Sequence, residues 1–62
     1  MADEKVMLTV EEAAARLSLG RTTLYELLSR GEIKAVHVGR AVRVLAREVE
    51  AFAQRLADAT RP

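Results

Sequence analysis

Two short amphipathic stretches separated by three residues constrain the fold of this chain more than any other feature of its sequence. The first stretch has apolar residues at the i, i+3, i+4 and i+7 spacing of one helix face, at Val10, Ala13, Ala14 and Leu17. The second has the i, i+3, i+4 spacing, at Leu24, Leu27 and Leu28. Because residues 18–20 are long enough only for a turn, the two helices must cross steeply. The segment from Thr9 to Gly31 is therefore predicted to be a helix-turn-helix.

The first helix has clear start and stop signals. Thr9 followed by Glu12 forms the sequence pattern of a capping box, so the helix is expected to begin at Val10. Glu11 and Glu12 also suit the positive end of the helix dipole, which gives both carboxylates a structural role. The helix is expected to stop at Ser18, where the backbone is expected to take an unfavourable angle.

The second helix is predicted to begin at Arg21, with Gly20 as its N-cap, and to end at Gly31 in the left-handed C′ position. At about 100° per residue its leucines share the buried face. The opposite, exposed face carries Thr22, Tyr25, Glu26 and Ser29, with Arg21 and Thr23 at its edges. Hydroxyls, an aromatic ring and a guanidinium can meet base edges and phosphates in a DNA major groove. We therefore favour nucleic-acid recognition over an ordinary solvated helix face.

From Ile33 onward the apolar period changes from helical to alternating, which predicts a two-stranded hairpin around a Gly39-Arg40-Ala41 turn. Val36, Val38, Val42 and Val44 are expected to point toward the helices, with Arg43 pointing outward. The hairpin would then form a basic wing that contacts phosphates through Lys34, His37, Arg40 and Arg43. Protection of an exposed strand edge by basic residues is the competing interpretation.

A third helix is predicted from about Ala46 to Ala57. Its apolar stripe is expected at Val49, Phe52, Ala53 and Leu56, with Phe52 as the largest anchor of the core. The fold class is thus α+β, a small winged helix-turn-helix with three helices and a hairpin between the second and third. Residues 1–8 show neither a cap nor a sustained period and are expected to be mostly frayed. The domain is placed at residues 8–57, between flexible ends at 1–7 and 58–62.

Composition favours a binding module over an enzyme. The chain has 62 residues with one Tyr, one Phe and no Trp, so its core must be small and built from Leu, Val and Ala. No Cys is present and there is one His, which excludes disulfides and disfavours zinc sites. No apolar run approaches the roughly 20 residues of a membrane span, and the N-terminus is unlike a signal peptide. We expect a cytoplasmic protein without cofactor, metal or membrane partner.

The net charge of +1 is unevenly distributed along the chain. Residues 13–47 contain seven basic residues and two acidic ones, whereas both ends of the chain have an excess of acidic residues. Positive charge is therefore concentrated on the second helix and the hairpin, where a polyanion would bind. A solvated surface would explain the charge alone equally well.

The sequence from Leu8 to Leu56 resembles the excisionase-type helix-turn-helix family, which is similar to the DNA-binding domain of MerR-type regulators. The matching features are the LTVEEAA start, the RTTLYELL helix, the break at Gly31, the VHVGRAVRV hairpin and the closing EVEAF helix. The resemblance implies a winged helix whose groove contacts fall to Arg21, Thr22 and Tyr25 and whose wing contacts fall to Arg40 and Arg43. The chain departs from the family around the turn, with Ser18 and then Gly20, and carries Glu26 on the recognition face.

The resemblance also implies a function. Excisionases bind repeated sites beside an attachment sequence, bend the DNA and recruit a tyrosine-type integrase. Cooperative self-association on adjacent repeats is expected, because one small subunit makes few phosphate contacts. A small transcriptional regulator with the same contacts is the first alternative. A protein-interaction adaptor that does not bind DNA is the second.

Overall fold

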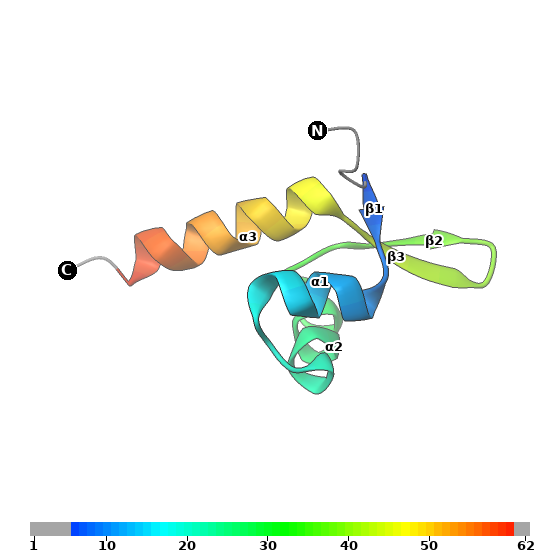
Figure 1. Ribbon diagram of the computed structural model, residues 1–62, viewed down its shortest axis with the longest axis horizontal. Coiled ribbons are helices and arrows are strands. Elements are labelled where there is room, and N and C mark those ends of the chain that lie inside the picture. Colours follow the sequence, from blue (N-terminus) through cyan, green and yellow to red (C-terminus); the bar gives the residue numbers. More distant parts are fainter. Residues whose placement is uncertain (1–5, 61–62) are drawn as a thin grey trace.

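The computed structural model describes residues 6–60, which form three helices and three short strands (Figure 1). In chain order the elements are β1 (Met7–Leu8), α1 (Val10–Leu17), α2 (Arg21–Ser29), β2 (Ala35–Val38), β3 (Ala41–Leu45) and α3 (Ala46–Ala59). In Figure 1 the β2–β3 hairpin projects to one side of the α1–α2 pair and α3 extends to the other. The predicted α+β winged helix-turn-helix is confirmed. The outer parts of the two predicted flexible ends, residues 1–5 and 61–62, lie outside the described residues.

The capping box at the start of α1 is confirmed. The backbone N–H of Thr9 donates to Oε1 of Glu12 at 2.9 Å, and the backbone N–H of Glu12 donates to Oγ1 of Thr9 at 3.0 Å. Two backbone donors at the helix start are thereby satisfied, which fixes the first residue of α1 at Val10.

Both helices of the pair end in the same motif. At the end of α2, Gly31 has φ +77°, and Glu32 N–H donates to the carbonyl of Leu27 at 3.0 Å. At the end of α1, Ser18 has φ 56°, and Leu19 N–H donates to the carbonyl of Ala14 at 2.9 Å. These are Schellman ends, in which the left-handed residue is usually glycine. The unfavourable backbone angle expected at Ser18 is confirmed, and it is a left-handed one, which costs L-residues energy.

One small apolar core joins the helices to the sheet. Its buried residues are Leu8, Val10, Ala13, Ala14, Leu24, Leu27, Ile33, Val44, Val49 and Phe52. The predicted stripe on α3 continues too far, because Ala53 is exposed and Leu56 keeps 46% of its surface exposed. The helix itself runs to Ala59, two residues beyond the predicted end. In Figure 1 its C-terminal part extends past α1.

The sheet has three strands in the order β1-β3-β2, and its first strand lies in a segment where the sequence predicted no helix or strand. Met7 pairs with Leu45 and Leu8 with Val44, in antiparallel register. The N–H of Ala46 also donates to the carbonyl of Val6 at 2.8 Å. Two residues are too few to show an alternating pattern, which is why β1 could not be predicted from the sequence.

The hairpin turn is one residue shorter than predicted. Only Gly39 and Arg40 form the loop, and Val38 pairs directly with Ala41. Gly39 has φ +62°, as expected for the first loop residue of a tight hairpin. A change of one residue in the loop shifts the register by one and turns every side chain of one strand to the opposite face.

The two faces of the hairpin therefore differ from the prediction. One face carries the pairs Val36–Arg43 and Val38–Ala41, and the other carries Ala35–Val44 and His37–Val42. Because directly paired residues point to the same face, the four valines do not share one side. Val44 is fully buried, whereas Val38 keeps 56% of its surface exposed. The prediction that all four valines pack on the helices was wrong.

Candidate nucleic-acid interface

Arg21, the first residue of α2, contacts a carboxylate from α1 and an aromatic ring one turn along α2. Its Nε lies 3.2 Å from Oε2 of Glu11, and its Cζ lies 5.5 Å from the centroid of the Tyr25 ring. Hydrogen bonding to Tyr25 and, second, the negative charge of Glu11 raise the pKa of Arg21 above its ordinary value. The guanidinium is therefore charged at every physiological pH. Its side chain is 63% exposed, so solvent screens the ion pair while leaving the cation accessible.

The rest of the outward face of α2 is also accessible. The side chains that the sequence assigned to it are all exposed, at Thr22, Thr23, Tyr25, Glu26 and Ser29. Leu24 and Leu27 hold the opposite face in the core. A nine-residue helix with no glycine or proline inside it presents this face as one surface. Its contacts with nucleic acid stay a prediction.

Glu11 is a site residue that sequence reasoning missed. The sequence assigned it only to the helix dipole, and it lies ten positions before Arg21. The short turn brings the first turns of α1 and α2 close enough for an ion pair. Opposite charges near the starts of two helices that share a three-residue turn are the signal that could have indicated it.

The predicted wing residues do not form one surface. His37 pairs with Val42, whereas Arg43 lies on the opposite face of the hairpin beside Val36. The prediction of one basic outer face that includes both side chains was wrong, because the register of the hairpin places them on opposite faces. Arg43 is half-buried, and its Nη1 donates to the carbonyl of Val42 at 2.9 Å. Arg40 is exposed at the tip.

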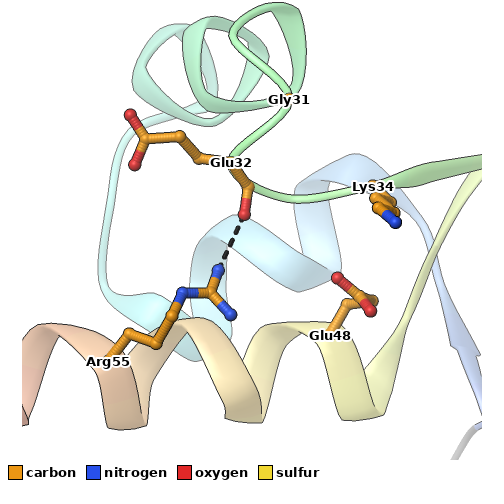
Figure 2. Close-up of a pocket in the computed structure, with 5 residues that line it drawn as sticks. All are labelled: Gly31, Glu32, Lys34, Glu48 and Arg55. Atoms are coloured by element: carbon orange, nitrogen blue, oxygen red, sulfur yellow. Dashed lines mark hydrogen bonds between the residues drawn. The ribbon is translucent and has the colours of Figure 1, made fainter.

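Lys34 lies apart from the hairpin tip, in a hollow of about 460 Å³ between α3 and the segment that follows α2 (Figure 2). The hollow is lined by Gly31, Glu32, Lys34, Glu48 and Arg55. Arg55 Nη2 donates to the carbonyl of Glu32 at 2.8 Å, and its Cζ lies 5.6 Å from the Phe52 ring centroid. This hydrogen bond ties α3 to the segment that follows α2, so Arg55 has a structural role.

Neither a metal centre nor a membrane-spanning helix is found in residues 6–60. No group of three or more His, Cys, Asp or Glu side chains is arranged to hold a metal ion in this part of the chain. None of the helices in the same range combines the length and apolar character that crossing a membrane requires. The cytoplasmic location stays a prediction.

Comparison with known proteins agrees with this architecture. A family model described as a helix-turn-helix domain matches residues 7–57. Over 52 residues the chain is 48% identical to a protein of Saccharopolyspora erythraea named "Probable excisionase", with 84% of this chain and 53% of that protein aligned. The chain belongs to the helix-turn-helix domain family. Its similarity to this relative agrees with the excisionase-type resemblance of the sequence.

Two further relatives of this family member come from Mycobacterium tuberculosis, one from strain CDC 1551 / Oshkosh and one from strain H37Rv. Each is named "Putative DNA-binding protein" and is 46% identical over 43 residues, which cover 69% of this chain and 55% of the relative. The chain spans about half the length of the curated relatives it matches. The wider resemblance to MerR-type regulators stays a prediction.

Proposed function

We propose that this chain is a sequence-specific, double-stranded DNA-binding protein that acts without catalysis. In this proposal α2 enters the major groove. The observation that supports it best is the exposed face of α2, with the Arg21 guanidinium held beside Tyr25 at the leading end of the helix. A guanidinium makes two parallel hydrogen bonds to the O6 and N7 atoms of guanine, which is the commonest specific contact in the major groove. Threonine and serine hydroxyls on the same face suit bases or phosphates.

The hairpin supplies a second contact in this proposal, on the DNA backbone or in the minor groove. Arg40 at the tip and Arg43 on one face carry permanent positive charge toward phosphates. His37 lies on the other face. The register therefore favours a wing contact through Arg40 and Arg43, with His37 turned away from it.

The specific role we propose is that of an excisionase, acting on repeated sites beside an attachment sequence together with a tyrosine-type integrase. The resemblance of the sequence and the name of the Saccharopolyspora erythraea relative support this role. The relatives named only as DNA-binding proteins favour a second candidate, a small transcriptional regulator. Both functions use the same contacts, so the location of the bound DNA distinguishes them.

The first test is selection of bound fragments from genomic DNA, followed by anisotropy titrations of the selected duplex and a scrambled duplex. We expect Arg21→Ala to cost about 1–3 kcal/mol on the selected duplex, which is the discrimination of one bidentate base contact, and little on the scrambled one. Arg47→Ala is the matched control, because it removes an exposed arginine from α3. If no fragment is enriched, or if both variants behave alike, DNA recognition by α2 is wrong and a protein-binding adaptor becomes the better hypothesis.

The same titrations at several salt concentrations test the wing. Arg43→Ala should weaken binding to both duplexes and reduce the slope of log K against log salt by about 0.9, the value for one lost phosphate contact. His37→Ala, on the opposite face of the same hairpin, should leave the slope unchanged. If His37→Ala reduced the slope and Arg43→Ala did not, the hairpin would contact DNA through the face that carries His37.

Footprinting at saturation tests the arrangement on DNA. Protection of several adjacent repeats beside an attachment sequence would support an excisionase. A promoter site with no attachment sequence nearby would support the regulator. Protection of a single half-site at saturation would contradict cooperative self-association.

A further inference from the structure

We propose that Glu11 is a positioning residue for DNA recognition: it holds the Arg21 guanidinium against Tyr25 so that it is aimed at a base edge rather than at a phosphate. This inference rests on the proposed function. Glu11 itself is the second residue of α1 and need not touch DNA.

Two contacts restrict the guanidinium in different directions. Oε2 of Glu11 lies 3.2 Å from its Nε, and its Cζ lies over the Tyr25 ring, 5.5 Å from the ring centroid. An ion pair at Nε leaves the Nη1 and Nη2 edge as the side that can form the two-bond contact to guanine. An arginine that is already oriented loses less side-chain freedom when it binds, because its planar group is held before the partner arrives.

The dipole of α1 does not account for this contact. A carboxylate in the first turn is stabilised by the dipole of its own helix without having to contact another helix. Glu11 nevertheless forms an ion pair with Arg21 of α2. A negative charge beside a phosphate-binding surface also lowers affinity for DNA of every sequence. Glu11 therefore contributes to discrimination between sequences and opposes affinity in general.

The test measures two dissociation constants for each variant, one for the duplex enriched from genomic DNA and one for a scrambled duplex of the same composition. Glu11→Gln should bind the scrambled duplex more tightly, because a repelling charge is lost. The dissociation constant for the scrambled duplex divided by that for the enriched duplex measures discrimination. This ratio should fall about two- to fivefold, which is the range that the free energy of an exposed ion pair allows. Glu11→Asp keeps the charge in the first turn but is one methylene too short for the 3.2 Å contact, so the ratio should fall here too.

Two controls separate positioning from other roles. Glu50→Gln removes an exposed carboxylate from α3 and should leave the ratio unchanged. In the Arg21→Ala background, Glu11→Gln should also leave the ratio unchanged, because its effect passes through Arg21. Far-ultraviolet circular dichroism of each variant verifies that α1 is intact.

The outcomes are distinct. If Glu11→Gln raises both affinities equally, Glu11 only repels DNA and positioning is wrong. If it lowers both equally, Glu11 only stabilises the fold and positioning is again wrong. If Arg21→Ala itself leaves the ratio unchanged, or if no duplex is enriched, the proposed function is wrong, and the role of Glu11, which rests on it, is wrong as well. If Arg21→Ala lowers the ratio and Glu11→Gln does not, the proposed function stands and the role of Glu11 is overturned.

Discussion

The helix pair and the hairpin both present residues proposed to contact DNA, but they are stabilised differently. The helix pair is fixed at its start by a capping box, at both helix ends by Schellman motifs, and in its centre by the fully buried Leu24. The hairpin is anchored at one end only, where Val44 is buried, and its tip carries the exposed Val38. The difference indicates a rigid surface for reading bases and a more adaptable one for the backbone.

The largest expected difference is in the free energy of unfolding. Leu24→Ala should lower it by about 2–5 kcal/mol, because the change leaves a cavity in a fully buried site. Val38→Ala should change it by about 0.5 kcal/mol or less, as for most exposed positions. Urea unfolding followed by circular dichroism measures both. Equal losses of stability would show that the hairpin tip is part of the core, and that it is not less firmly held than the helix pair.

Glycines with similar backbone angles allow a sharper test. Gly31→Ala and Gly39→Ala each place an L-residue in the left-handed region, with open space around the new Cβ, so each adds about 1–2 kcal/mol of backbone strain. We expect Gly31→Ala to lower the free energy of global unfolding by the whole of this strain energy. Strain at Gly39 can be relieved by opening the tip, so global stability should fall less.

Native-state hydrogen exchange distinguishes the two responses. In Gly39→Ala the amides of the Val38–Ala41 pair should exchange faster, while those of α1 keep their protection. An equal loss of protection in both regions would mean that the hairpin and the helices unfold as one unit.

The smallest expected effect is a gain. Ser18→Gly removes the strain of a left-handed serine, about 1–2 kcal/mol, and adds flexibility to the unfolded chain that costs about 0.4–1 kcal/mol. The net stabilisation should be about 0.8 kcal/mol, seen as a small rise in the urea midpoint. A loss of stability would show that the serine side chain contributes to the turn beyond its backbone angle.

The same contrast explains how much could be predicted from the sequence. The helix ends followed from local signals such as Thr9 with Glu12 and the glycine at position 31, because a cap lies within a few residues of its partner. The hairpin faces could not be predicted because they depend on a single residue in the loop.

Features that depend on tertiary contacts also could not be predicted from the sequence. Leu56 fits the apolar stripe of α3, but whether it is buried depends on which elements pack against that part of the helix, and the stripe does not specify them. The Glu11–Arg21 ion pair depends on the angle at which two helices meet. Of the candidate site, the sequence therefore predicted which residues of α2 are exposed and that Arg43 points away from Val44, but it predicted neither what holds Arg21 nor that His37 lies on the face opposite Arg43.

The β1–β3 pairing has a consequence for the order of folding. It joins Leu8 to Val44, so everything proposed to touch DNA lies inside one chain loop closed by two residue pairs. Helices with their own caps and a hairpin with a two-residue loop need only local contacts, which form early, whereas closing a long loop has a larger entropic cost. We therefore expect β1 to dock last during folding and to be the first element to detach during unfolding.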